Sequence, residues 1–334
     1  MVIVVGGGIS GVACAGELNA RGIAVQLHDR GHKLGGRMAS RVIRDSETKF
    51  DGHIVDIGAS YFTASAESFS AVVADWQSRG LARGWTDSFH LATPQGVAGV
   101  RGGPMRFAAP GGLRSLVADL ASKLPSTQIT SNHSVEAVSF AGDHLTVDEV
   151  PAIAVALCMP DPQARAILDS KSPQLEAAIE ATCGVVWEPT FAVTAVFQNT
   201  CWAPFDGVFV NDDAVLTWIA NDGSRRGDHA PVLVAHVDPV LAAGHLADPA
   251  AVIPIVLAAL QRILALTEQP IWVDIQRWTY ARPLIAWADE CYLDDDVNIG
   301  LASDAWAGGP RVETAWLSGT ALGQRIAERL AAST

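Results

Sequence analysis

The stretch MVIVVGGGISGVACAG (residues 1–16) places a run of β-branched side chains directly before three consecutive glycines. The run Val2–Val5 predicts a buried strand, and the small and apolar residues from 9 to about 21 predict a helix. Glycine is the residue that makes the intervening turn without strain. The chain therefore opens with a strand, a tight turn and a helix, which is the start of a βαβ unit.

The glycines of this turn follow the spacing G-x-G-x-x-G. In units that bind dinucleotides, the first glycine allows the turn, the second admits a pyrophosphate to the backbone, and the third lets the helix pack on the strand. The start of the helix then offers free amides to the phosphates. A purely structural βαβ unit is the alternative. The residues that we expect to contact a dinucleotide here are Gly6, Gly8, Ser10 and Gly11.

A second predicted strand, IAVQLHD (residues 23–29), ends about twenty positions after the glycines. Its last residue is an aspartate, whose carboxylate can accept hydrogen bonds from ribose hydroxyls. The next stretch, DRGHKLGGRMASR (residues 29–41), adds a flexible glycine pair and an arginine that can reach the same pyrophosphate. An ordinary surface loop is the alternative for this stretch. The predicted dinucleotide contacts are Asp29, Arg30, Gly36 and Arg37.

Near the C-terminus, NIGLASDAWAGGPRVETAWLSGTALGQRIAERL (residues 298–330) has the order strand, turn and helix again. A predicted strand ends near Ala302 and leads to Asp304. Pro310 suits the start of a helix, and Glu313 suits its first turn. Small or apolar residues then recur at helical spacing, which predicts a helix packed on the core.

Together these segments resemble the flavoprotein amine oxidase superfamily, in which G-G-R follows the acidic residue and the C-terminal motif runs A-G-D…G…V-E-G-A…S-G. The resemblance implies resident FAD, with Asp304 at its ribityl-phosphate region and the helix N-terminus facing the flavin ring. Ser303 and Thr314 stand where the superfamily has glycine, which leaves open a looser grip on FAD. The C-terminal residues implied to bind FAD are Asp304, Arg311, Val312, Glu313 and Ala315.

Two intervening segments continue this resemblance. FDGHIVDIGASYFTA (residues 50–64) matches a D-x-G-A…F loop that covers the flavin, with a buried strand and turn as the alternative. HSVEAVSFAGDHLTV (residues 133–147) indicates a small β-hairpin, whose first part would contact adenine through its backbone. The FAD contacts implied by these segments are Gly58, Ala59 and Val135.

The chain changes character after Pro160. Short β-rich runs separated by Asn, Asp, Gly and Pro predict an antiparallel sheet, residues 249–266 predict a helix, and IWVDIQRWTYARP (residues 271–283) predicts a long returning strand. The resemblance implies an α/β fold, in which an FAD-binding Rossmann-type domain of the glutathione-reductase-2-like kind carries a discontinuous substrate domain of antiparallel sheet plus helix. We expect the FAD-binding domain at 1–72, 105–160 and 275–334, and the substrate domain at 73–104 and 161–274.

Within the superfamily the chain most resembles the renalase-like group, particularly its bacterial members, on stretches such as LTWIANDGSRRG (residues 216–227) and QRWTYARP (residues 276–283). This resemblance implies noncovalent FAD, hydride transfer from 2- or 6-dihydro isomers of NAD(P) to the flavin, and reduction of O2 to H2O2. Many amine oxidases of the superfamily use a lysine and a tyrosine-lined cage. The present chain has no lysine beyond Lys171 and only three tyrosines, so such an amine site is not expected.

Hydride transfer to a flavin needs little acid–base help, so the protein must supply stacking, orientation and exclusion of water. His236 resembles the group's active-site histidine, with a hydrogen-bonded core histidine as the alternative. Trp218 and Trp278 lie on apolar strands and are either core or pocket residues. The predicted catalytic-site residues are His236, Tyr280, Trp278 and Tyr61. The arginines that either bind substrate phosphate or are solvated surface charges are Arg225, Arg226, Arg277 and Arg282.

The net charge and the cysteine content of the chain limit the classes of molecule that we expect it to bind. A formal net charge of -13 over 334 residues argues against nucleic-acid and anionic-membrane partners. Five scattered cysteines without C-x-x-C spacing predict neither disulfides nor zinc and favour the cytoplasm. We expect a small-molecule substrate (a dihydronicotinamide dinucleotide or an amine), molecular oxygen, and a monomer or dimer. Two other functions stay open: a different flavin-dependent amine oxidase or desaturase for a small hydrophobic substrate, and a non-catalytic dinucleotide-binding protein.

Overall fold

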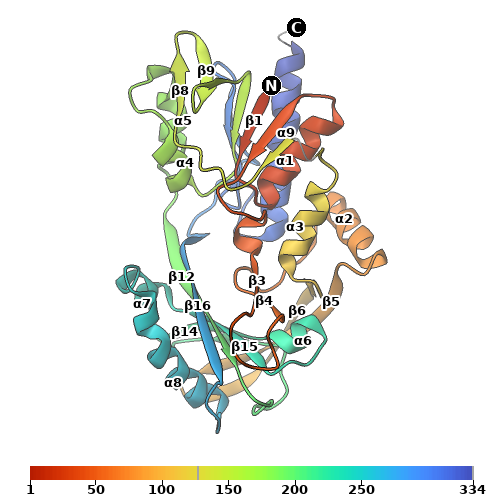
Figure 1. Cartoon of the computed structure of the whole chain (residues 1–334), viewed down its shortest axis with the longest axis vertical. Helices are drawn as coiled ribbons and strands as arrows, with labels where there is room; N and C mark the ends of the chain where they lie inside the picture. Colours follow the sequence, from red (N-terminus) through yellow and green to blue (C-terminus); the bar gives the residue numbers. More distant parts are fainter. Residues whose placement is uncertain (126–127, 333–334) are drawn as a thin grey trace.

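The structure, a computed structural model, describes residues 1–125 and 128–332. Figure 1 shows two parts stacked along the long axis of the molecule. The upper part holds a mostly parallel sheet with helices beside it, and the lower part holds a larger sheet with α7 and α8 on one side. The predicted α/β fold, with a Rossmann-type unit and a second part built on a mainly antiparallel sheet, is confirmed.

The upper sheet has six strands in the order β17-β18-β11-β1-β2-β7, all parallel except β17 at one edge. Alternate residues of β1 enter two separate cores, because Val2 and Val4 face α1 and α9 while Ile3 and Val5 face the opposite side. Burial of both faces explains why this strand is a continuous apolar run. The strands are β1 (Val2–Val5), β2 (Val25–His28), β7 (Ile129–Thr130), β11 (Ala154–Leu157), β17 (Tyr292–Asp294) and β18 (Ile299–Leu301).

Helices α1 (Ile9–Ala20) and α9 (Val312–Ala332) pack against each other on one face of this sheet. A side chain at Gly319 would overlap the Ser10 carbonyl oxygen, and a Cβ atom at Gly323 would lie 2.8 Å from the Cys14 carbonyl oxygen. The small residues predicted in the C-terminal helix therefore allow the two backbones to approach closely. The helix starts at Val312, two residues after the predicted proline.

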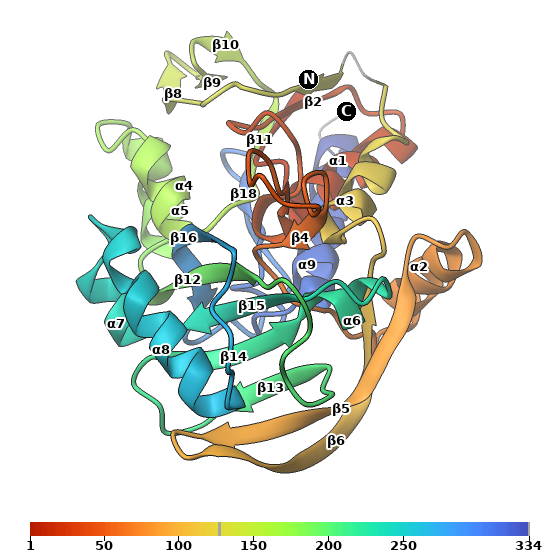
Figure 2. The same ribbon diagram turned by 60° about the horizontal axis from the view of Figure 1, so that its bottom comes forward.

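The lower sheet has seven strands in the order β16-β12-β15-β14-β13-β5-β6. One face packs on α8 (Ile253–Leu264) around a core that includes Leu233 and Leu260. The opposite face, with Val234 and Trp278, packs on the two-stranded sheet β3–β4 of the upper part. Figure 2 shows α7 and α8 lying across β12 and β14. The strands are β5 (Arg83–Thr93), β6 (Gly96–Ala108), β12 (Trp187–Val196), β13 (Gly207–Val210), β14 (Leu216–Asn221), β15 (Val232–Val237) and β16 (Trp272–Pro283).

Shorter elements complete the fold. The predicted hairpin at 133–147 forms β8 and β9, and the predicted helix at 249–266 forms η4 followed by α8. That helix ends at Leu264 because Ala265 adopts a left-handed conformation with φ 52°. The shorter elements are η1 (Gly36–Met38), β3 (Ser40–Val42), β4 (Ile54–Asp56), α2 (Glu67–Ser78), α3 (Leu113–Ala121), β8 (Val138–Ala141), β9 (His144–Val147), β10 (Val150–Pro151), α4 (Asp161–Ile167), η3 (Pro173–Leu175), α5 (Glu176–Ala181), α6 (Asp222–Arg226), α7 (Pro239–Gly244) and η4 (Pro249–Val252).

The domain boundaries stay a prediction. The boundaries expected at 73, 105 and 275 fall inside α2, β6 and β16. The segment α4–α5, which was expected in the substrate domain, packs on the face of the upper sheet opposite α1 and α9. Within the described ranges, no helix has the length and apolar character needed to cross a membrane.

Candidate active site

The glycine turn between β1 and α1 is built by close backbone contacts. Gly6 has φ +106°, and a side chain there would overlap the carbonyl of Cys158 at the end of β11. A Cβ atom at Gly36 would lie 3.2 Å from the Cα atom of Gly8, so the first and second glycine turns meet backbone to backbone. Both turns need glycine for their contacts as well as for their dihedral angles.

Asp29 joins these turns. Its two carboxylate oxygens accept hydrogen bonds from the backbone amides of Gly7, at 2.6 Å, and Gly31, at 2.7 Å. Its carbonyl accepts a bond from the amide of His133 at 2.9 Å, which brings the segment leading to Val135 beside β2. Each carboxylate oxygen has a second lone pair, so Asp29 can still accept a ribose hydroxyl. Val135 itself is buried in the core on the face of the upper sheet opposite α1 and α9.

Arg37 and Asp304 join the two ends of the chain. The Arg37 guanidinium donates to both carboxylate oxygens of Asp304, at 2.6 and 3.0 Å, although 267 positions separate the residues. It also donates to the Ala281 carbonyl at 3.1 Å and lies 5.0 Å from the ring centroid of Trp187. Arg37 follows β2 and Asp304 follows β18, so they meet at the carboxyl end of the parallel sheet, where dinucleotides bind in such folds.

The loop after β4 lies against this pair. A Cβ atom at Gly58 would overlap the Arg37 carbonyl, and the amide of Ala59 donates to the same carbonyl at 2.8 Å. On β16 of the lower sheet, the indole N–H of Trp278 donates to the Ile57 carbonyl at 2.6 Å. The indole N–H of Trp218, which is 5% exposed, donates to Ser60 Oγ at 2.9 Å. Both tryptophans therefore fix the loop with their N–H groups.

His236 is brought to the same loop. It pairs directly with Trp218 across β14 and β15, on the sheet face that points to the upper part. Its Nε2 atom is buried and has no hydrogen-bond partner among the described residues. Burial and, secondarily, the Arg225 guanidinium lower the pKa of His236 to about 4, against the effect of a bond to the Gly58 backbone. His236 is therefore a neutral imidazole at physiological pH.

Tyr61 belongs to an aromatic group on the same face. Its ring centroid lies 5.1 Å from that of Phe89, 5.7 Å from that of Trp218 and 6.4 Å from that of Trp85. Burial raises the pKa of Tyr61, so its hydroxyl stays protonated. Tyr280 lies two residues after Trp278 on β16 and is partly buried. The structure thus brings His236 and Trp278 to the loop that carries Tyr61, and Tyr280 lies further along β16.

A buried ion cluster is the feature that the sequence interpretation missed. The sequence predicts that Arg225 and Arg226 are phosphate ligands or solvated charges, but these arginines are 0% and 6% exposed. Both guanidiniums pair with Asp222, and Arg226 also pairs with Asp56 at 2.6 Å. Arg225 donates to the Ser60 carbonyl at 3.0 Å. These arginines therefore hold the loop after β4 from inside the protein.

The start of α9 is fastened to the chain itself. Glu313 accepts bonds from the backbone amides of Ser65 and Ala66 at 2.6 and 2.7 Å, just before α2. Burial would raise the pKa of Glu313, but these bonds lower it overall. The hydroxyl oxygen of Thr314 accepts a bond from the Arg311 amide at 3.1 Å, which satisfies a backbone N–H at the start of the helix. The same hydroxyl also contacts the Gly309 and Arg311 carbonyls, so this departure from glycine stabilises the turn before α9.

Other predicted residues lie at the margin. Arg30 is exposed, and its guanidinium is 2.9 and 3.1 Å from the amide oxygen of Gln163 in the orientation that satisfies both groups. Arg311 is also exposed and lies 3.5 Å from Glu313. Arg282 pairs with Glu188 at 2.6 Å, and the exposed Arg277 donates to a backbone carbonyl. The last two are surface groups, as one of the two sequence alternatives held.

Comparison with known proteins identifies the family. Residues 66–327 match the sequence profile of flavin-containing amine oxidoreductases, and residues 4–76 match an NAD(P)-binding Rossmann-like domain. The chain belongs to the flavin-containing amine oxidoreductase family. Membership makes it an FAD-dependent oxidoreductase, which sets aside the alternative of a non-catalytic dinucleotide-binding protein.

Solved structures share the fold of this oxidoreductase at low identity. Cyclohexylamine oxidase from Brevibacterium oxydans IH-35A is 14% identical, with a TM-score of 0.75 and 99% of each chain covered. Wild-type putrescine oxidase bound to putrescine is 16% identical, with a TM-score of 0.70, 99% of this chain and 98% of that chain covered. A protein of Exiguobacterium sp. 255-15 assigned as a protoporphyrinogen oxidase is 16% identical, with a TM-score of 0.75 and 98% of each chain covered.

The residues of the oxidoreductase fit FAD. The two glycine turns leave backbone open at the N-terminus of α1, where Ser10 Oγ is buried without a partner among the described residues. A helix start with free amides favours a pyrophosphate. Arg37 and Asp304 supply the cation and the acceptor expected for the phosphate and ribityl groups.

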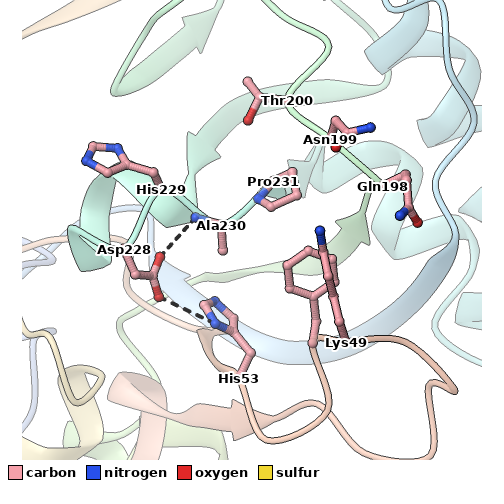
Figure 3. A pocket seen from close by; sticks show the side chains of 10 residues that line it. Lys49, His53, Gln198, Asn199, Thr200, Asp228, His229, Ala230 and Pro231 are labelled. Atoms are coloured by element: carbon pink, nitrogen blue, oxygen red, sulfur yellow. Dashed lines mark hydrogen bonds and ion pairs between the residues drawn. The ribbon is translucent and has the colours of Figure 1, made fainter.

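A hollow of about 460 Å³ lies apart from these residues (Figure 3). Figure 3 shows His53 pointing toward Asp228, and their Nδ1 and Oδ2 atoms are 3.4 Å apart. None of the predicted site residues lines this hollow, which is bordered by Lys49, Phe50, His53, Gln198, Asn199, Thr200, Asp228, His229, Ala230 and Pro231.

Proposed function

We propose that this oxidoreductase is renalase-like and takes a hydride from 2- or 6-dihydro isomers of NAD(P), releasing the normal oxidised dinucleotide. The observation that supports this substrate is the charge beside the aromatic group. Arg106 is buried, its guanidinium lies 4.4 Å from the ring centroid of Phe89 and donates to the Asp87 backbone carbonyl, and no carboxylate of the described residues forms an ion pair with it. A phosphate-bearing substrate would be attracted to this cation, whereas a cationic amine would be repelled.

The chain's own residues have positioning tasks in this proposal. The aromatic group with Tyr61 offers flat surfaces for a dihydropyridine ring. Neutral His236 adds no charge where a pyridinium product forms. In this proposal the N-terminus of α9 faces the flavin, where the positive end of the helix favours negative charge on a bound group. FAD, when bound, supplies the two-electron acceptor for the hydride and passes the electrons to O2, giving H2O2.

An amine substrate is the second candidate. The aromatic group that contains Tyr61, Phe89 and Trp218 also suits a cation held over ring faces. The putrescine and cyclohexylamine oxidases with this fold are named for amines. The lack of a lysine beyond Lys171 favours the dihydronicotinamide substrate over an amine. The positive charge of Arg106, which a backbone carbonyl but no described carboxylate contacts, favours it too.

Anaerobic mixing distinguishes the two substrates. FAD-loaded protein is mixed with ordinary NADH, with NADH enriched in its ring-position isomers, with putrescine and with cyclohexylamine, and the flavin absorbance is recorded. The proposal expects bleaching with the isomer-enriched sample and none with either amine. Bleaching by an amine alone would assign the second candidate.

Arg106 gives a more specific test. Arg106→Met is expected to raise KM for a dihydronicotinamide dinucleotide about tenfold with little change in kcat, because it removes a binding cation. Arg101→Met, an exposed position on the same strand β6, is the matched control and should behave as wild type. Equal effects of the two substitutions would refute a role for Arg106 in binding.

We also propose that FAD is held noncovalently by a cytoplasmic protein that is a monomer or dimer. The contacts available to FAD are backbone amides and charged groups, and the five cysteines are free thiols. Acid precipitation should release all yellow colour into the supernatant, whereas a covalent link would leave it in the pellet.

A further inference from the structure

A buried carboxyl group, that of Asp161, lies at the carboxyl end of the upper sheet. Asp161 is the first residue of α4, directly after β11. The chain leaves β1 toward β2 on one side of the sheet and leaves β11 toward β18 on the other. This reversal creates the crevice at the strand carboxyl ends in which open parallel sheets bind ligands.

The side chain of Asp161 has an unmet bonding capacity. The residue is 1% exposed, and its Oδ2 atom is buried without a partner at hydrogen-bonding geometry in residues 1–125 and 128–332. The nearby donor that acts on this carboxyl group is the Trp187 indole N–H, which also has no described partner at hydrogen-bonding geometry. A buried carboxylate oxygen without a partner is costly. A native protein retains such a group where a ligand or a bound proton satisfies it.

The charges that face Asp161 favour a bound proton. Asp304, after β18, adds negative charge, and both oxygens of Asp304 already engage Arg37. Arg165, one turn further along α4, donates to the Thr182 carbonyl at 3.3 Å. Burial and then Asp304 raise the pKa of Asp161 to about 7, and the Trp187 indole, Arg37 and Arg165 act in the opposite direction.

We propose that Asp161 is a further cofactor-binding residue, which holds FAD as a neutral carboxylic acid and donates its proton in a hydrogen bond to an oxygen of the phosphate or ribityl chain. In this proposal the pyrophosphate brings negative charge to a site where the Arg37 guanidinium is already paired with Asp304. That charge disfavours ionised Asp161 and strengthens its hold on the proton. Asp161 therefore keeps its proton when FAD binds below pH 7, and takes up a proton when FAD binds above pH 7.

The test is the affinity of the full-length protein, freed of FAD, for added FAD between pH 6 and pH 9, read from flavin fluorescence. For wild type, Kd should rise about tenfold between pH 6 and pH 8, because free Asp161 loses its proton near pH 7 while the bound form keeps it. Asp161→Asn keeps a neutral group with an N–H donor. Its Kd should stay near the wild-type pH 6 value at every pH.

Two variants complete the design. Asp161→Ala lacks the donor and should bind FAD more weakly than Asp161→Asn at all pH values. Asp143→Asn, on an exposed turn where the aspartate side chain is 90% exposed, should follow the wild-type curve. His28 is a second titrating group at the end of β2, and burial, followed by the nearby His133, lowers its pKa from the ordinary 6.5. Because Asp161→Asn leaves His28 unchanged, any slope that His28 contributes stays in that variant and is separated from the slope due to Asp161.

A measurement without substitution guards against a variant that does not fold. Calorimetric titration of wild type with FAD at pH 7.5, in two buffers of different ionisation enthalpy, should show net proton uptake of less than one proton per FAD. Proton release, no exchange, or an Asp161→Asn curve with the wild-type slope would overturn the proposal. No substrate is present in these titrations, so their failure leaves the proposed dihydronicotinamide substrate untouched.

Discussion

Replacing Asp222 by asparagine tests the buried ion cluster beneath the loop at 57–61. Asp222 is fully buried, and its two oxygens bind Arg225 and Arg226. Burial alone would raise the pKa of Asp222, but the two guanidiniums hold it well below its usual range. Asp222→Asn removes the charge while keeping the shape, and leaves Asp56 alone to balance two buried cations.

Breaking a buried ion pair from one side costs about 3–5 kcal/mol. At about 2.1 cal/mol/K per residue, unfolding 334 residues corresponds to about 0.7 kcal/mol per degree, so the expected fall in Tm is about 4–7 °C. Scanning calorimetry of both proteins measures it. The control is Asp228→Asn, because the Asp228 side chain is 46% exposed and such pairs contribute about 0–1 kcal/mol. A Tm for Asp222→Asn as close to wild type as that of the control would refute the reasoning.

Three further predictions concern packing, positioning and pH. Gly319→Ala should lower Tm by several degrees in calorimetry, because its methyl group would overlap the Ser10 carbonyl between α1 and α9; an unchanged Tm would contradict that contact. Trp278→Phe removes the donor to the Ile57 carbonyl and should cost about 0.5–1.5 kcal/mol in urea unfolding, with retention of full stability as the opposing result. His236 has a pKa of about 4 in the folded protein, below the ordinary 6.5, so the unfolded chain binds more protons between pH 4 and pH 6.5. The free energy of unfolding should therefore fall as the pH drops from 6.5 to 4, and His236→Gln should flatten this dependence. An unchanged dependence in the variant would mean that a group other than His236 causes it.

Local sequence patterns predicted the frame of the cofactor site. The strand, glycine turn and helix at the N-terminus appear at the predicted residues because each is set by nearby side chains and by backbone geometry. Asp29 was predicted as a ribose ligand, and the structure adds that its carboxylate ties Gly7 to Gly31. The pairing of Arg37 with Asp304 could be anticipated only through the family resemblance, because 267 positions separate the two residues.

Features that depend on distant partners escaped prediction. The stretch NDGSRRG (residues 221–227) is polar and suggests a solvated turn, yet its arginines are buried because Asp56 comes from β4 to meet them. The spacing of Asp222 three and four positions before Arg225 and Arg226 is the signal that could have indicated the cluster. Strand alternation places tryptophans on one face but does not predict which carbonyl an indole N–H will reach.

The most direct test of the central claim is a single-turnover experiment without oxygen. FAD-loaded protein is mixed with one equivalent of 6-dihydro-NADP, the flavin absorbance is followed, and the nucleotide product is identified by chromatography. The account predicts full bleaching with one equivalent of NADP⁺ formed, followed by one equivalent of H2O2 when air is admitted. Persistent yellow colour with the nucleotide unchanged, in protein that putrescine or cyclohexylamine does bleach, would contradict it.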